Sequence, residues 1–271
     1  MRQPYQTDPE PTAPESVTVA TAAHPDIARE RDFEQGPGPP AGRRAPTGRE
    51  GGAAALRPGR ALRPGPQRGK GIAVPHKFHP GNMARLESEE RRQRQPPEAL
   101  LEAIGVTPGL RLADVGCGPG FYALPAARLV GPSGSVHALD VQEPMLTRVR
   151  ERVAAEGLGN VHPALSQESQ LPLQDGAVDL VLVANVLHEA ADRVAFLREV
   201  RRVLAPGGRV TIVEWRREST GMGPPLEERM SEEEVRSALR EAGFAEPEGL
   251  ASEVTGPTHY GLVAGAGGAA R

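Results

Sequence analysis

Three glycines at alternate positions, Gly116, Gly118 and Gly120, lie in the stretch ADVGCGPGF at residues 113–121. They follow a short apolar run that contains Asp114. Glycine adopts backbone dihedrals that other residues disfavour, and it lets a ligand approach the backbone closely. If a helix begins directly after this loop, its first N–H groups point at that ligand. The stretch therefore predicts a ligand-binding turn between a strand and a helix.

Two common ligands of glycine loops fit these residues poorly. A phosphate-binding P-loop needs a lysine followed by serine or threonine after its glycines, and neither follows here. A dinucleotide turn has the pattern GxGxxG, whose third glycine lets the helix pack on the strand. Gly116 and Gly118 fit this pattern, but Phe121 occupies the third position. An NAD-dependent oxidoreductase therefore stays an alternative that Phe121 disfavours.

The elements around the loop alternate between apolar, β-branched runs and helical segments. This alternation predicts an α/β fold, with a doubly wound, mostly parallel sheet and helices on both faces. The expected strands are residues 111–115, 135–140, 178–185 and 209–215, with two weaker strands near residue 244 and at residues 259–263. The expected helices are residues 96–105, 122–129, 144–156, 192–204 and 231–243, the last opening with a capping box.

The large apolar residues are unevenly distributed along the chain. Residues 1–70 are rich in Pro, Gly and Arg and poor in large apolar side chains, so they are predicted to form a disordered tail. Residues 71–109 are predicted as an N-terminal helical cap segment, residues 110–263 as the main domain, and residues 264–271 as a frayed C-terminus.

The composition of the chain indicates which binding partners and which cellular compartment to expect. Arginines crowd residues 43–70, although the whole chain carries a net charge of -3. No aromatic residues lie between them to stack on bases, so a nucleic-acid partner is disfavoured. The chain has no apolar run of membrane-spanning length and no signal-peptide apolar region, which predicts a cytoplasmic protein. Cys117 is the single cysteine, and His76 and His79 lack a third ligand at suitable spacing, so no metal site is expected.

Three blocks of sequence carry a resemblance to a known family. The first is DVGCGPG with Asp140 at the end of the next predicted strand. The others are LPLQDGAVDLVLVANVLHE and FLREVRRVLAPGGRVTIVEW. Together they cover residues 110–215, and they resemble class I S-adenosylmethionine-dependent methyltransferases. The similar branch acts on small molecules, carries a type 11 methyltransferase domain and includes the ubiquinone and menaquinone methyltransferases.

The resemblance implies a site for S-adenosylmethionine. The three glycines would let its methionyl portion lie against the backbone, and Asp114 would hold its ammonium group. Asp140 would accept hydrogen bonds from both ribose hydroxyls, although an NAD site uses a carboxylate in the same way. The remaining cofactor candidates are Val141 and Met145 beside the adenine, Gln167 or Glu168 at its amino group, and Asn185 at the methionyl end.

The same resemblance implies methyl transfer to a small-molecule acceptor. His188 follows the fourth expected strand and would be a general base if the acceptor must lose a proton; otherwise it hydrogen-bonds within its loop. The upstream segment would cover the site, which makes His76, Phe78, His79 and, near the last strand, His259 and Tyr260 acceptor-pocket candidates. A non-catalytic module for cofactor binding or for interaction through the basic tail is the other alternative.

Overall fold

The computed structural model describes residues 81, 83–219 and 221–267. The predicted tail and the pocket candidates His76, Phe78 and His79 lie outside this part of the chain. The described helices are α1 (Met83–Leu86), α2 (Glu89–Arg94), α3 (Pro97–Ala103), α4 (Ala123–Val130), α5 (Glu143–Glu156), the 3-10 turn η2 (Leu187–Glu189), α6 (Arg193–Val203), α7 (Glu232–Glu241) and α8 (Ser252–Thr255).

Seven strands form one sheet in the order β3-β2-β1-β4-β5-β7-β6. They are β1 (Arg111–Val115), β2 (Ser135–Asp140), β3 (Val161–Leu165), β4 (Val178–Ala184), β5 (Leu204–Trp215), β6 (Glu248–Gly249) and β7 (His259–Gly265). The pairs among β1 to β5 are parallel, whereas β7 runs antiparallel to β5. The doubly wound, mostly parallel sheet expected from the sequence is confirmed.

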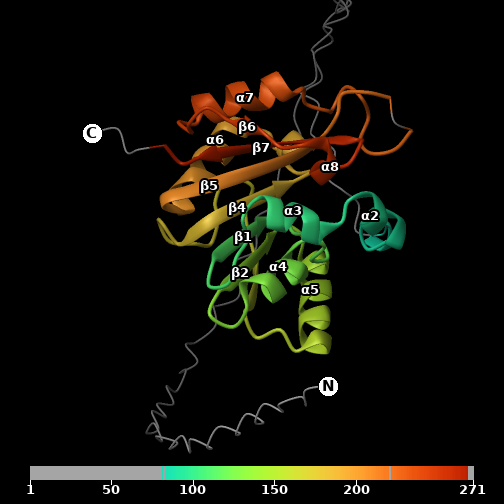
Figure 1. Ribbon diagram of the computed structural model, residues 1–271, viewed down its shortest axis with the longest axis vertical. Coiled ribbons are helices and arrows are strands. Elements are labelled where there is room, and N and C mark those ends of the chain that lie inside the picture. Colours follow the sequence, from blue (N-terminus) through green and yellow to red (C-terminus); the bar gives the residue numbers. More distant parts are fainter. Residues whose placement is uncertain (1–80, 82, 220, 268–271) are drawn as a thin grey trace, which may run out of the picture. The chain divides into compact units, whose positions relative to one another are not determined.

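Helices cover both faces of the sheet (Figure 1). The α3, α4 and α5 helices pack over one face, and α6 and α7 pack over the other. Side chains of β4 alternate between these two cores: Leu180 and Leu182 belong to one, Val181 and Val183 to the other. This alternation explains the nearly continuous apolar sequence of β4, because a strand covered on both faces has no solvent side.

Local sequence signals predicted the ends of the helices α3, α4, α5, α6 and α7 to within about two residues. The α7 helix begins after Ser231, whose side chain and that of Glu234 form the expected capping box. The α5 helix ends at Gly157, which has a left-handed φ of 66°. The edge strand β3 was not predicted, since His162 and Pro163 interrupt its apolar pattern.

Two expected boundaries differ from the structure. Phe244 is buried in the core but does not belong to a strand. The short strand β6 follows it at Glu248–Gly249. The strand β7 continues to Gly265, two residues past the expected end of the main domain, because it pairs along the length of β5 as far as Arg209.

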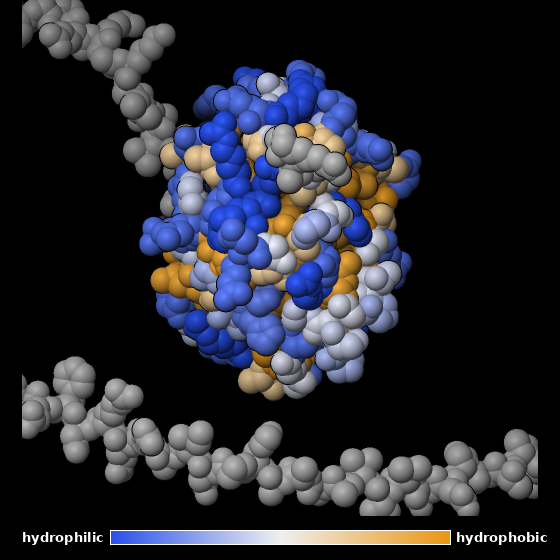
Figure 2. All heavy atoms as spheres, turned by 90° about the vertical axis from the view of Figure 1, so that its left-hand side faces the viewer, coloured by the Kyte–Doolittle hydropathy of each residue, from blue (hydrophilic) through white to orange (hydrophobic). Residues whose placement is uncertain are grey.

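One face of the molecule is shown in Figure 2, where hydrophilic residues cover most of the surface. The hydrophobic residues visible there lie in several separate groups. Most large apolar side chains are instead buried in the two cores. None of the helices within residues 81, 83–219 and 221–267 combines the length and apolarity needed to cross a membrane.

Candidate active site

A cavity of about 460 Å³ opens at the carboxyl ends of β1, β4 and β5. The neighbours β1 and β4 are the point at which the strand order reverses, because the chain runs outward to β3 and returns to β4. Such switch points create a crevice in which α/β proteins bind ligands. The volume is typical of a small-molecule site.

The glycine loop after β1 forms one wall of the cavity. Gly116 and Cys117 donate their N–H groups to the Leu139 carbonyl, at 2.7 and 2.9 Å, and so tie the loop to β2. Gly116 has a φ of 73°, and a Cβ atom there would lie 2.3 Å from Val186 Cγ2. Gly118, with a φ of 53°, lines the cavity. The positive φ favours glycine at both positions, whereas close packing requires it only at Gly116, because a Cβ atom at Gly118 would lie 3.6 Å from Leu86 Cδ1, an ordinary contact.

Gly120 differs from the other two glycines, although all three were predicted to lie along the methionyl portion of the cofactor. It does not line the cavity, and a Cβ atom there would lie 2.4 Å from Leu124 Cδ1 and 3.4 Å from Val149 Cγ2. Its φ is 86°. Gly120 therefore lets α4 pack against the loop, and any contact with a ligand is made by Gly116 or Gly118.

Asp140, at the end of β2, organises the loop as well as lining the cavity. Its Oδ2 accepts the Gly118 N–H at 2.9 Å, and its Oδ1 accepts the Gln142 N–H at 2.8 Å. The residue is 7% exposed. A carboxylate oxygen has lone pairs for more than one hydrogen bond, so Asp140 can bind a ligand hydroxyl while holding the loop.

Asp114 lies in β1 and is 1% exposed. Its Oδ2 is buried and has no hydrogen-bond partner among the described residues. Burial, and then the negative charge of Asp140, raise the pKa of Asp114 to about 7, while Arg91 opposes the shift. A buried carboxylate oxygen that lacks a donor fits a cationic or N–H-bearing ligand group.

Asn185 follows β4 with a left-handed φ of 60°, the only non-glycine residue with positive φ in the described part of the chain. Its N–H donates to the Val213 carbonyl at 2.8 Å. Its side-chain Oδ1 is buried without a partner among the described residues, and the residue lines the cavity. Sparsely populated backbone of this kind is concentrated at binding sites.

His188, on η2, forms a buried pair with Glu214 of β5. His188 Nδ1 lies 2.8 Å from Glu214 Oε2, and the His188 N–H donates to Glu214 Oε1 at 3.2 Å. Burial lowers the pKa of His188, but Glu214, Glu189 and Glu228 outweigh it, so that the net shift is upward. With Nδ1 held by the carboxylate, Nε2 is the ring nitrogen left to act in the cavity, which His188 lines.

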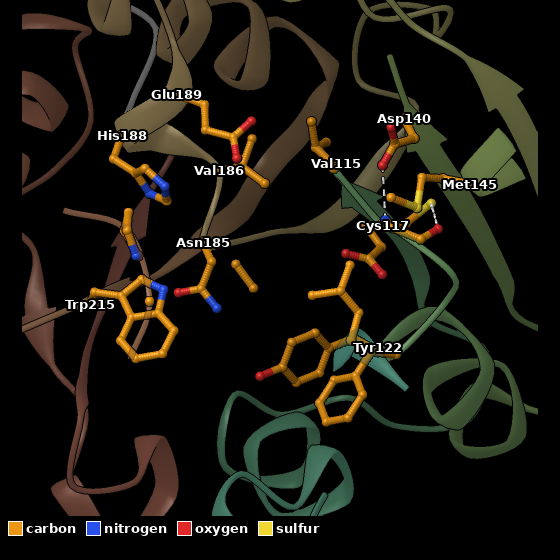
Figure 3. A pocket seen from close by; sticks show the side chains of 18 of the residues that line it. Val115, Cys117, Tyr122, Asp140, Met145, Asn185, Val186, His188, Glu189 and Trp215 are labelled. Carbon is orange, nitrogen blue, oxygen red and sulfur yellow. Dashed lines mark hydrogen bonds between the residues drawn. The ribbon is translucent and has the colours of Figure 1, made fainter. Parts of the chain in front are cut away.

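The cavity has two ends (Figure 3). Asp140 and Met145 lie at one end, whereas His188 and Trp215 lie at the other, with Asn185 between them. This arrangement separates the predicted cofactor residues from the predicted base.

The end near Asp140 also contains the other predicted cofactor residues. Val141, Met145, Gln167 and Glu168 all line the cavity. Glu168 Oε1 accepts the Ala191 N–H at 2.5 Å, so this carboxylate also anchors the loop before α6. The sequence reasoning missed Ser166, a buried neighbour of Gln167 that lines the same wall.

The last strands form the opposite end of the cavity. Tyr260 was predicted to line the acceptor pocket there, but the structure places it elsewhere. Tyr260 is buried in the core, and its hydroxyl donates to the Met230 carbonyl at 3.1 Å. It does not line the cavity, but His259 and Thr258 do. Successive residues of a strand point to opposite faces, so only one of the pair His259 and Tyr260 faces the cavity.

The described part of the predicted cap segment contributes to the cavity wall. Arg91 of α2 lines it, with its guanidinium 3.9 Å from the centre of the Phe121 ring. The sequence reasoning missed Arg91 and Trp215, which line the cavity, and Glu214, which holds His188 from behind the lining. Glu214 had one available signal, because it is a charged residue within a strand that is otherwise apolar.

Comparisons with known proteins identify related methyltransferases. A family model described as a methyltransferase domain matches residues 112–208. The chain is 36% identical over 124 residues to demethylmenaquinone methyltransferase of Geobacillus kaustophilus, covering 46% of this chain and 53% of the relative. It is 33% identical over 116 residues to the ubiquinone/menaquinone biosynthesis C-methyltransferase of Vibrio parahaemolyticus, covering 42% and 45%. The chain thus spans about half the length of the curated relatives it matches.

A solved structure extends the match over the whole length of a relative. The crystal structure of an S-adenosylmethionine-dependent methyltransferase from Aquifex aeolicus is 35% identical, with a TM-score of 0.66, and the match covers 70% of this chain and 99% of that chain. The chain belongs to the S-adenosylmethionine-dependent methyltransferase family. In this methyltransferase Gly116, Gly118, Asp140 and Asn185 line one cavity.

Proposed function

We propose that this methyltransferase transfers a methyl group from S-adenosylmethionine to a small-molecule acceptor. The observation that carries the proposal is the buried Asp114 Oδ2 beside the glycine loop, which has no donor among the described residues. The ammonium group of S-adenosylmethionine supplies such a donor with a compensating charge. An NAD pyrophosphate would instead bring negative charge toward the buried Asp114 carboxylate, so the oxidoreductase alternative is disfavoured.

The same cavity offers partners for the rest of the cofactor. Asp140 would accept the ribose hydroxyls, since a carboxylate oxygen can accept more than one hydrogen bond. Val141 and Met145 would flank the adenine, and Gln167 or Glu168 would accept from its amino group. Gly116 and Gly118 would lie along the methionyl portion, and Asn185 Oδ1 would face its reactive end.

When bound, S-adenosylmethionine supplies a methyl group on an activated sulfonium. The protein aligns the acceptor with this methyl group and excludes water from the cavity. We assign to His188 the removal of a proton from the acceptor through Nε2, while Glu214 holds Nδ1 and stabilises the resulting imidazolium.

The acceptor proposed is an aromatic ring of the hydroquinone type, whose hydroxyl group carries an ionisable hydrogen. Two observations support this class. The aromatic residues Phe121, Tyr122, Phe196 and Trp215 line the cavity. The curated relatives are named for methyl transfer in menaquinone and ubiquinone biosynthesis.

Calorimetric titration of the purified protein tests the proposal. S-adenosylmethionine and S-adenosylhomocysteine are expected to bind, and NAD is not. Binding of NAD with neither methyl-donor ligand would contradict the proposal in favour of an oxidoreductase. Binding of the first two without turnover of any hydroxylated aromatic acceptor would instead favour a non-catalytic module.

A further inference from the structure

His259 is a buried histidine on the acceptor side of the cavity, and the proposed chemistry does not use it. It is 2% exposed, and it lines the cavity. Its Nδ1 lies 2.9 Å from the Thr258 hydroxyl oxygen. Its Nε2 is buried and has no partner among the described residues. A buried polar atom without a partner is costly, which indicates that a ligand completes its hydrogen bonding.

The imidazole ring of His259 is held in one orientation. His259 and Trp215 face each other across the antiparallel pair of β7 and β5, with ring centroids 4.1 Å apart. Gly223 packs against the indole, since a Cβ atom there would lie 2.8 Å from the ring. The Arg229 guanidinium lies 5.3 Å from the indole centroid. The stack therefore fixes the direction of Nε2.

Charges around the two cavity histidines give them different roles. Burial, and then the positive charges of Arg91, Arg229, Arg94 and Arg216, lower the pKa of His259 to about 3, so the ring is neutral. Glu214, Glu189 and Glu228 instead surround His188. Titratable groups whose environments separate their pKa values take different parts in a reaction. His188 suits proton removal, whereas His259 suits hydrogen bonding.

The arginines also determine what His259 binds. Arg91 and Arg94 line the cavity from α2, and Arg229 lies behind Trp215. Their positive potential favours an electronegative ligand atom at Nε2. To donate a hydrogen bond to this ligand atom, His259 must carry its hydrogen on Nε2. In that tautomer the Thr258 hydroxyl donates to Nδ1.

We propose that His259 is a specificity-determining residue whose Nε2–H donates a hydrogen bond to a ring oxygen of an aromatic acceptor. The proposal rests on the proposed function, because it concerns the acceptor of that same reaction. It assigns the acceptor class as an aromatic ring bearing a hydroxyl or carbonyl oxygen.

Two probes of nearly equal size test this role without turnover. The protein is first saturated with S-adenosylhomocysteine and then titrated by calorimetry with 1-naphthol or 1-methylnaphthalene. Burial alone favours the methyl compound, because it is the more apolar. The wild-type protein is expected to bind 1-naphthol about five- to tenfold more tightly, as one hydrogen bond to a buried group contributes.

Three substitutions of His259 isolate the hydrogen bond. His259→Phe keeps a ring against Trp215 and is expected to lose the preference for 1-naphthol, whereas His259→Gln keeps an N–H donor and retains part of it. His259→Leu is expected to lose the preference as well, so the test does not depend on the folding of one variant. The matched control is His137→Phe in β2, outside the cavity lining, which is expected to keep the wild-type preference.

The outcomes separate this inference from the proposed function. Failure of the wild-type protein to bind S-adenosylhomocysteine would refute the proposed function and, with it, the role of His259. Binding of S-adenosylhomocysteine but of neither probe would refute the aromatic acceptor class. An equal affinity for both probes, or a preference that survives in His259→Phe and His259→Leu, would refute the role of His259 alone.

Discussion

The affinity for S-adenosylhomocysteine is expected to depend on pH through Asp114. The pKa of this carboxyl group is about 7 in the ligand-free protein, because it is buried and lies near Asp140. The ligand ammonium group requires the ionised carboxylate. Protonation therefore competes with binding as the pH falls through 7.

Linkage gives the size of this effect. The apparent dissociation constant rises by a factor of about 1.1 at pH 8, about 2 at pH 7 and about 11 at pH 6, relative to its high-pH limit. Affinity is therefore expected to fall about tenfold between pH 8 and pH 6. At pH 7, binding is expected to release about half a proton from Asp114.

Substitution of Asp114 by asparagine tests the assignment. Asp114→Asn keeps the size of the side chain but removes the charge, so affinity at pH 8 is expected to fall about ten- to a hundredfold, as loss of a charge-assisted bond of about 1.5–3 kcal/mol requires. The pH dependence is expected to flatten at the same time. Asp175→Asn is the control, since that carboxylate is 84% exposed and is paired with Arg202.

Calorimetry at pH 6, 7 and 8, in buffers of different ionisation enthalpy, measures both the affinity and the number of protons released. A wild-type affinity that does not change with pH would refute the reasoning. An Asp114→Asn variant with the wild-type pH dependence would assign the titration to another group.

Four further predictions concern residues in or next to the cavity. Asp140→Ala is expected to weaken S-adenosylhomocysteine binding about ten- to a thousandfold, and Asp140→Asn by less, since it keeps an acceptor; equal losses would mean that the substitutions disturb the Gly118 loop. His188→Ala is expected to lower turnover at least about a hundredfold with cofactor affinity nearly intact, and unchanged turnover would leave His188 a structural role. Because a base acts when deprotonated, the rate is expected to rise with pH through an inflection above 6.5, and Glu214→Gln should move that inflection downward in the pH–rate profile. Gly116→Ala is expected to reduce unfolding free energy by about 1–3 kcal/mol in chemical denaturation, because its φ is 73° and the added Cβ meets a side chain at 2.3 Å; wild-type stability would contradict the close packing.

Local sequence determined the order and type of most elements. Short apolar runs predicted four of the parallel strands, and glycine at position 157 and the capping box of Ser231 and Glu234 marked helix ends. These signals work because dihedral preferences and capping bonds depend on residues close in sequence. Asp140 was predicted in a different way, from the resemblance, because it ends the strand that follows the glycine loop and lies twenty residues beyond Gly120.

Contacts between segments far apart in the sequence determine which side chains form the acceptor end of the site. The sequence could not show that Trp215 faces His259, because their stacking depends on the antiparallel register of β5 and β7. It could not show that Glu214 holds His188, since they are 26 residues apart and belong to different elements.

The choice between His259 and Tyr260 has the same origin. Alternation along a strand means that one of two neighbours faces the cavity, but only the partner strand and the helix packed on it determine which. The Tyr260 hydroxyl donates to the Met230 carbonyl in the core. His259 therefore faces the cavity, with its Nε2 buried. The sequence alone thus determined the family pattern and the cofactor loop, whereas the burial and charge that distinguish Asp114, His188 and His259 arise only when distant segments pack together.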